Sequence, residues 1–98
     1  MVKWSHPARD DLRAIHDYIA LDSRFYAQKV VREIIEKANT IEEIPERGRV
    51  VPEMNENDVR ELFVYSYRII YQISQKKIFI LAVIHGKRDI SAEYIIKQ

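Results

Sequence analysis

The 98-residue sequence predicts an α+β fold, in which an antiparallel α-hairpin packs on one face of a mostly antiparallel four-stranded sheet. Two observations predict this class. Apolar residues recur at helical spacing through most of the first 41 residues, whereas β-branched and aromatic residues dominate residues 59–85. Because the helices precede the long strands, the two kinds of element should form separate layers. The expected order is strand, helix, helix and three strands, followed by a short tail or helix.

Residues 1–4 are expected to form a short strand that two helices follow. Ser5 is a good N-cap for the first helix, which should end near Leu21, and Asp22 or Ser23 caps the second. The second helix carries a wide apolar stripe made of Ala27, Val30, Val31, Ile34, Ile35, Ala38 and Ile41. Because almost nothing joins the helices, they should lie antiparallel, with their joint apolar face covered by the sheet.

The remaining strands come from the second half of the chain. Residues 49–52 are expected to form a short edge strand, because Pro52 cannot donate a hydrogen bond to a neighbouring strand. Residues 59–73 and 78–85 are each interpreted as one strand, and the polar residues 74–77 form the turn between them. Both strands are apolar on both faces, so they should lie centrally in the sheet.

Length and composition bound the class of protein. The chain is long enough for one domain, residues 1–98, and its 47% hydrophobic content allows a small core. It has no cysteine, which excludes disulfides and thiolate metal sites and suits a reducing cytoplasm. Neither a signal peptide nor an apolar run of membrane-spanning length is recognisable, so we expect a cytoplasmic protein without membrane contact. We also expect no metal and no cofactor, because no ligand constellation is visible.

The net charge of +1 hides an asymmetry between the two halves. Residues 60–98 carry seven basic and three acidic residues, a net charge of +4, whereas residues 1–59 carry nine basic and twelve acidic residues, a net charge of −3. A basic half suggests an anionic partner, either nucleic acid or an acidic peptide. The alternative is that lysines such as Lys76 and Lys77 simply guard the sheet edge.

Three polar residues stand out against the apolar strands. Arg68 lies within one strand, and His85 and Arg88 lie at or just past the end of the next. If Ile73 pairs with Ile78, Arg68 and His85 become diagonal neighbours on one face, whereas a register slip of one residue would separate them. We therefore expect a site on an open, concave face of the sheet.

An ordered set of short patterns resembles the RelE/ParE superfamily, the toxins of bacterial and archaeal type II toxin–antitoxin modules. The patterns span nearly the whole chain and are Trp4-Ser5-x-x-Ala8-x-x-Asp11-Leu12-x-x-Ile15-x-x-Tyr18-Ile19, Pro45-x-x-Gly48-Arg49-x-Val51-Pro52-Glu53, Arg60-Glu61, Tyr67-Arg68-Ile69-Ile70-Tyr71 and His85-Gly86-Lys87-Arg88. The resemblance implies the same α-hairpin on an antiparallel sheet. It also implies a cognate antitoxin that wraps around the toxin, and contact with operator DNA only through that complex.

The resemblance implies two unlike activities. RelE-type toxins enter the ribosomal A site and cleave mRNA, whereas ParE-type toxins inhibit DNA gyrase and are not nucleases. The favoured interpretation is mRNA cleavage, because an arginine, a second arginine and a tyrosine of the nuclease pattern match Arg68, Arg88 and Tyr94 in type and spacing. Gyrase inhibition, and a degenerate module that only binds its antitoxin, are the alternatives.

The nuclease interpretation assigns each of these residues a role in attack of a 2′-hydroxyl on the adjacent phosphate. Arg68 and Arg88 suit the charge that develops on the phosphate, and Tyr94 suits stacking on a base or positioning the phosphate. His85 suits a general base or acid, a common role of an imidazole. The alternatives are that His85 caps a loop carbonyl and that Tyr94 is a core residue.

The chain departs from the nuclease pattern on one strand. Where that pattern has two lysines, this sequence has Arg60 and Glu61, which we expect to contact substrate together with Lys87. Lys87 alternatively binds an acidic antitoxin segment. Arg68, for its part, alternatively forms a structural bridge with Glu53 or Glu61.

Overall fold

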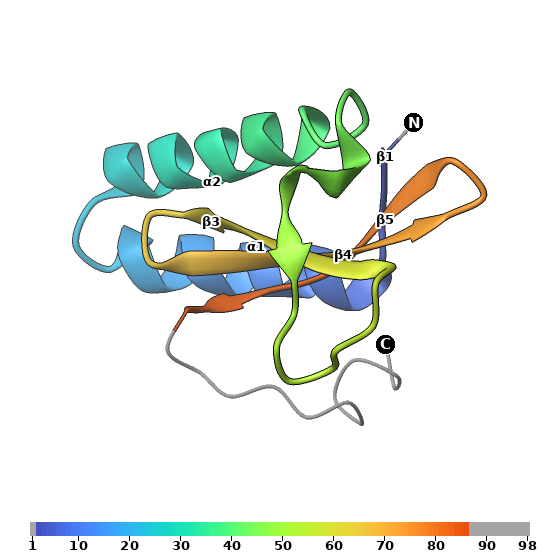
Figure 1. Ribbon diagram of the computed structural model, residues 1–98. Coiled ribbons are helices and arrows are strands. Elements are labelled where there is room, and N and C mark those ends of the chain that lie inside the picture. The colour runs from blue at the N-terminus through green and yellow to red at the C-terminus, as the bar shows by residue number, and fades with distance from the viewer. Residues whose placement is uncertain (1, 87–98) are drawn as a thin grey trace.

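A computed structural model describes residues 2–86, which form an α-hairpin and a five-stranded sheet. The elements in chain order (Figure 1) are β1 (Val2–Trp4), α1 (His6–Ala20), α2 (Arg24–Asn39), the 3-10 helix η1 (Pro45–Arg47), β2 (Arg49–Val50), β3 (Val59–Val64), β4 (Tyr67–Ser74) and β5 (Lys77–His85). The expected α+β class, with the α-hairpin before the long strands, is confirmed. Neither helix of this part of the chain has the length and apolarity that crossing a bilayer requires.

Both helices begin at serine caps. The Ser5 hydroxyl accepts a hydrogen bond from the backbone N–H of Ala8 at 3.1 Å, and Ser23 accepts one from Tyr26 at 3.0 Å. Each cap satisfies a backbone donor that the helix leaves unpaired, an effect of about 1 kcal/mol. Ser23, rather than Asp22, is therefore the N-cap of α2.

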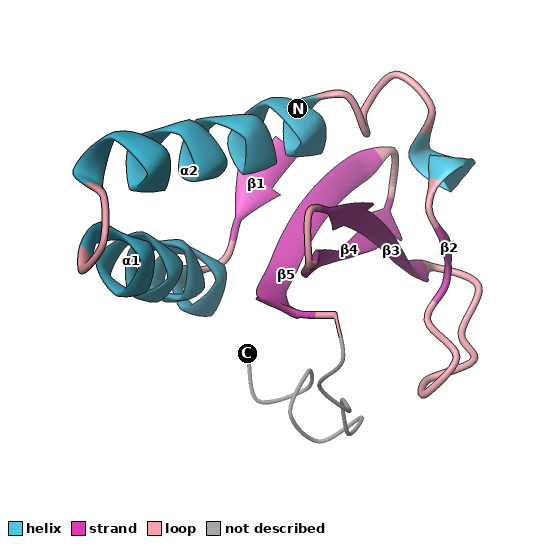
Figure 2. Ribbon diagram, turned by 90° about the vertical axis from the view of Figure 1, so that its left-hand side faces the viewer, coloured by secondary structure: helices cyan, strands magenta, loops and turns pink. Residues whose placement is uncertain are grey.

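The main hydrophobic core lies between the helices and the sheet. Figure 2 shows α1 and α2 on one side of the strands, so the sheet has a helix-covered face and a second face. The buried side chains of this core are Ala8, Val30, Ile34, Ala38, Ile41, Ile69, Tyr71, Ile78, Ile80 and Val83. Burial of each large aliphatic side chain stabilises the fold by roughly 1.5–3 kcal/mol.

The sheet has five strands where four were expected, and it is partly parallel. Its order is β1-β5-β4-β3-β2, and β1 pairs with β5 in parallel. The extra strand arises because residues 59–73, expected to be one strand, reverse at Tyr65 and Ser66 to form the β3–β4 hairpin. Tyr65 has a φ of 56°, in the left-handed region that tight hairpin turns usually fill with Gly or Asn. The composition of this segment therefore carries no turn signal.

The register between β4 and β5 changes along the hairpin. Ile73 pairs with Ile78, as expected. A β-bulge then leaves Leu81 without an opposite residue on β4, and beyond it the pairing is shifted by one residue. Arg68 consequently pairs with Ile84.

The start of α1 stabilises this bulge. The Ser5 hydroxyl donates to the Leu81 carbonyl oxygen at 3.2 Å, and the Asp11 carboxylate accepts from the backbone N–H of Val83 at 2.9 Å. β1 pairs with β5 only as far as Ile80, so these two side chains supply partners for backbone groups of β5 beyond the end of β1. Contacts between residues more than 70 positions apart in the chain thus accompany the shifted register of β5.

The second face of the sheet has a smaller core. Its buried residues are Val51, Val59, Ile70, Ala82 and Ile84. Residues 51–58, the connection that follows β2, contribute Val51 and the partly buried Met54, and they lie on the β2 side of the sheet in Figure 2. The face that was expected to stay open is therefore partly covered.

Candidate functional site

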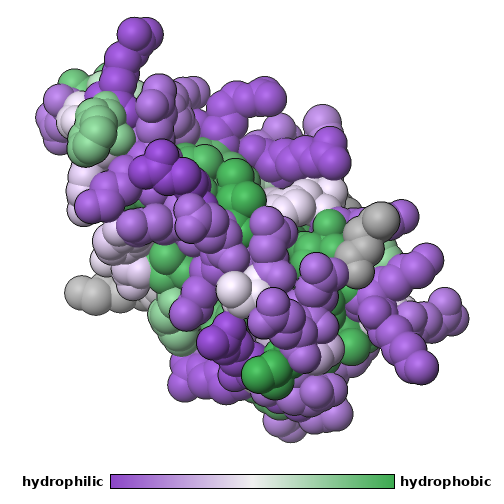
Figure 3. Space-filling model, turned by 90° about the horizontal axis from the view of Figure 1, so that it is seen from above, coloured by the Kyte–Doolittle hydropathy of each residue, from purple (hydrophilic) through white to green (hydrophobic). Residues whose placement is uncertain are grey.

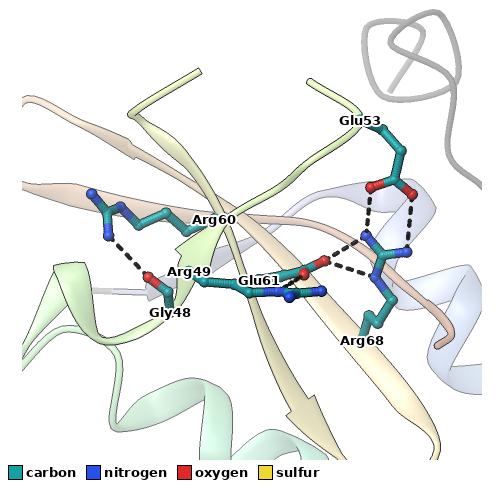
Figure 4. A network of polar contacts seen from close by, with 6 residues as sticks. All are labelled: Gly48, Arg49, Glu53, Arg60, Glu61 and Arg68. Carbon is teal, nitrogen blue, oxygen red and sulfur yellow. Dashed lines mark hydrogen bonds and ion pairs between the residues drawn. The ribbon is translucent and has the colours of Figure 1, made fainter. Parts of the chain in front are cut away.

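The second face of the sheet contains a buried ion pair. Arg68 on β4 is 5% exposed, and Glu61 on β3 is 1% exposed. The register places them as diagonal neighbours, because Glu61 pairs with Ile70 and Arg68 with Phe63. The Arg68 Nε donates to Glu61 Oε1 at 2.8 Å, and Nη2 lies 2.5 Å from the same oxygen (Figure 4).

Two further residues extend this pair into a network. Both terminal nitrogens of Arg68 donate hydrogen bonds to the Glu53 carboxylate. Nη1 donates to Oε2 and Nη2 to Oε1, each at 3.1 Å (Figure 4). Arg49 on β2 donates from Nε to the other carboxylate oxygen of Glu61. We call these four residues, Arg49, Glu53, Glu61 and Arg68, the ionic network. Its two guanidinium groups balance its two carboxylates, and it ties the 51–58 connection to the sheet.

The electrostatics of Arg68 follow from this environment. Burial alone lowers the pKa of its guanidinium, but the hydrogen bonds and negative charges of Glu53 and Glu61 outweigh burial and raise the pKa above its ordinary value. To bind Arg68, an external phosphate would have to displace a carboxylate that already forms a bidentate pair with the guanidinium. The predicted structural bridge is therefore confirmed, and Arg68 pairs with both Glu53 and Glu61.

Arg60 has a different environment, on the neighbouring position of β3. Its Nη1 donates to the carbonyl oxygens of Gly48 at 2.9 Å and Glu46 at 3.1 Å, and its Nε donates to that of Asn57 at 3.0 Å. Arg60 thus joins the connection before β2 to the connection after it. Gly48 is required at this point, because a Cβ atom there would lie 2.5 Å from the backbone oxygen of Glu61.

The Tyr71 hydroxyl supports the same connection from the core. It accepts from the backbone N–H of Gly48 at 2.9 Å and donates to the carbonyl oxygen of Pro45 at 2.7 Å. Burial raises the pKa of the Tyr71 phenol above its ordinary value. Both hydrogen bonds hold the entry to β2, from which Arg49 reaches the ionic network.

His85 lies on the other, helix-covered face of the sheet. It pairs with Tyr67, and the two rings meet edge to face with their centroids 6.1 Å apart. Both residues line a hollow of about 370 Å³, together with Tyr18 of α1. Burial, and secondarily the neighbouring Tyr18, raise the pKa of Tyr67.

The expected diagonal contact between Arg68 and His85 is wrong. Residues that pair directly share a face, and His85 pairs with Tyr67, the residue next to Arg68 on β4. The bulge at Leu81 causes this, because it shifts the register by the single residue that separates one face from the other. The two residues therefore do not form one site.

The other predicted site residues divide into two groups. Arg60 and Glu61 were expected to contact substrate. Arg60 instead donates to backbone carbonyl oxygens, and Glu61 accepts from Arg68 within the ionic network. Lys87, Arg88 and Tyr94 lie outside the described residues, so their roles stay predictions. Within residues 2–86, no three His, Asp or Glu side chains gather as metal ligands would.

Sequence reasoning missed two functional contacts of this region. Arg49 was quoted only as part of a pattern, although it pairs directly with Glu61 across β2 and β3. An arginine on an expected edge strand, opposite an acidic residue on an apolar strand, is a signal that would have indicated the pair. Asp11 offered no such signal, because its partner is a backbone N–H at a bulge that only the fold creates.

A model of a known protein family matches most of the chain. The family model for the ParE toxin of type II toxin–antitoxin systems, parDE, matches residues 2–90. Toxin RelE2 of Caulobacter vibrioides is 34% identical to this chain over 88 residues, which cover 89% of this chain and 96% of that protein.

Solved structures share the fold. A chain of the chromosomal ParDE system from P. aeruginosa superposes with a TM-score of 0.74 at 27% identity, over 88% of this chain and 95% of that chain. A chain of the RelBE2 toxin–antitoxin complex from Mycobacterium tuberculosis superposes with a TM-score of 0.65 at 21% identity, over 87% and 95% of the two chains. The second likeness concerns the fold alone.

Proposed function

Because this chain belongs to the ParE toxin family of type II toxin–antitoxin systems, we propose that it stops growth by binding its target and not by cutting RNA. The proposed target is DNA gyrase, which toxins of the ParE type inhibit. A cognate antitoxin neutralises it, as the family match and the ParDE system of its structural relative support.

The ionic network is the observation that supports this proposal. Metal-independent cleavage of RNA needs a base for the 2′-hydroxyl and cations directed at the phosphate. In this chain the arginine of the nuclease pattern, Arg68, is held by Glu53 and Glu61, and His85 lies on the opposite face of the sheet. Two carboxylates, rather than lysines, surround the place where a phosphate would bind Arg68.

A second candidate function, ribosome-dependent cleavage of mRNA, is favoured by two observations. The relative that is 34% identical carries the name Toxin RelE2. The spacing of Arg68, Arg88 and Tyr94 also fits the nuclease pattern. Under this candidate, Arg88, His85 and Tyr94 act on the RNA, and Arg68 maintains the sheet that carries them.

Two assays on the same protein separate the candidates. The purified chain is added to a gyrase supercoiling reaction, and RNA from cells that express it is analysed by primer extension. We expect loss of supercoiling with intact transcripts. Transcripts cut within codons, with supercoiling unaffected, would refute the binding mechanism and establish the second candidate.

A further inference from the structure

One end of the molecule exposes an unusual set of large apolar side chains. The α1–α2 connection, the β3–β4 turn and the end of β5 meet there, at the left in Figure 1. The set, which we call the tip patch, consists of Tyr18, Leu21, Phe25, Tyr26 and Tyr65, with exposed fractions of 73%, 83%, 77%, 47% and 51%. Seen from above, green apolar atoms reach the surface at the same end (Figure 3).

The area of the tip patch suits a protein interface. A large aromatic side chain offers roughly 150–250 Å² of surface. At the observed exposures, the five side chains leave on the order of 600 Å² of largely apolar surface uncovered. Monomeric proteins rarely exceed this size of patch, and a stable interface needs roughly 800 Å² from each partner. At about 600 Å² a side, two tip patches together correspond to the lower end of specific interfaces, about 1,200 Å² in total.

This end combines exposed apolar side chains with a recess. Leu21, at the end of α1, and Phe25, in the first turn of α2, are both more than three-quarters exposed. Beside them lie two adjoining hollows of about 370 and 360 Å³, which share Tyr18, Tyr67 and His85 as lining residues. An exposed apolar pair and an aromatic recess thus occur on the same surface.

A side-chain contact joins two of the elements around the recess. The hydroxyl of Tyr65, which lines the second hollow, donates to Glu33 on α2 and so joins the β3–β4 turn to that helix. The described residues that line the two hollows include no Lys or Arg, so the recess is poorly suited to a phosphate backbone. A second protein surface of apolar character suits it better.

We propose that two copies of this chain associate through the tip patch as a two-fold dimer. In such an isologous interface, Leu21 and Phe25 of each copy enter the aromatic recess of the other, so one surface supplies both halves of the contact. Two patches buried together remove on the order of 1,200 Å² of side-chain surface from water, the lower limit for a specific interface. The proposed dimer does not depend on which target the toxin binds.

Sedimentation velocity of the purified chain tests the dimer. We expect twice the 11.7 kDa mass of one chain at about 100 µM protein, an ordinary range for a homodimer. Phe25→Glu, which buries a charge in the recess, should raise the dissociation constant at least about 100-fold. Ile44→Glu is the matched control, because Ile44 is 57% exposed beyond the opposite end of α2. That variant should remain dimeric, and both variants should keep the circular dichroism spectrum of the unchanged chain.

Two results would overturn the dimer. One is a wild-type chain that sediments as a monomer across this range. The other is a Phe25→Glu variant that associates as tightly as Ile44→Glu. If the wild-type chain is monomeric and Phe25→Glu instead loses binding to the antitoxin encoded beside it, the tip patch belongs to the antitoxin and the proposal fails.

Discussion

The two faces of the sheet are stabilised in different ways. On the helix-covered face, the buried side chains of one apolar core come mainly from both helices and from β4 and β5. On the second face, the small apolar cluster adjoins the ionic network, in which one guanidinium joins two strands and a connection. The stabilisation from apolar burial is non-directional and is shared among many side chains. A buried ion pair stabilises the fold only while each charge keeps its partner. Single substitutions should therefore cost more on the second face.

The largest effect is expected for Arg68→Ala. This change leaves the fully buried Glu61 side chain without its main partner, and removing one member of a buried pair costs about 3–5 kcal/mol. The free energy of unfolding, measured in urea, should fall by that amount. A loss below about 1 kcal/mol, typical of exposed pairs, would show that the network contributes no more than a surface bridge.

Tyr71→Phe should have the next largest effect. It removes the hydroxyl that bonds to both Gly48 and Pro45, which should cost roughly 2–3 kcal/mol because a buried donor and acceptor lose their partner. Thermal unfolding of the two proteins at neutral pH measures this difference. Equal stability would mean that the connection before β2 is held without the tyrosine.

The same residue gives a pH dependence of known sign. The folded-state pKa of Tyr71 is raised above its ordinary value of 10.0, so the folded chain holds this proton more tightly than the unfolded chain. The contribution of Tyr71 to the free energy of unfolding is therefore complete below the ordinary pKa of the phenol. It is lost as the pH rises through the folded-state pKa. Tyr71→Phe should therefore lose less stability than the unchanged chain on going from neutral to strongly alkaline pH. A steeper loss in the variant would contradict this sign.

Asp11→Ala should cost about 1–2 kcal/mol, because it leaves the buried backbone N–H of Val83 without its acceptor. Asp11→Asn keeps an acceptor oxygen and is the matched control, so it should cost less. Amide hydrogen exchange at Val83 reports the site directly, with faster exchange expected in the alanine variant. Unchanged exchange would mean that the bulge is fixed without this carboxylate.

Ile34→Val should have the smallest effect of the four, although Ile34 is completely buried. One methylene lost from a distributed core costs about 0.5–1.5 kcal/mol. Urea unfolding beside Arg68→Ala compares the two faces within one experiment. If the isoleucine variant lost more than the arginine variant, the contrast between the faces would be reversed.

Local signals made most of the fold predictable. Ser5 and Ser23 mark the two helix starts, and the apolar stripe of the second helix predicted its contact with the sheet. The errors lie where distant residues decide. The β3–β4 turn places Tyr65 at a positive φ without Gly or Asn, and the bulged Leu81 is bonded by Ser5, 76 positions earlier in the chain.

Of the candidate site, only the ion pairs of Arg68 were predictable from the sequence. An arginine in an apolar strand requires a counter-charge, and Glu53 and Glu61 were foreseen as partners of Arg68. That Arg68 and His85 lie on opposite faces was not predictable, because a single bulged residue shifts the register by one position and moves His85 to the other face.

The double variant Glu61→Leu with Arg68→Met tests the central claim most directly, that Arg68 serves the fold and not a reaction. Replacing both members of a buried pair by apolar residues of similar volume is often close to neutral for stability. We predict a folded protein that arrests growth on expression as the unchanged chain does. A variant with an unchanged melting temperature that no longer arrests growth would contradict the account and return Arg68 to the active surface.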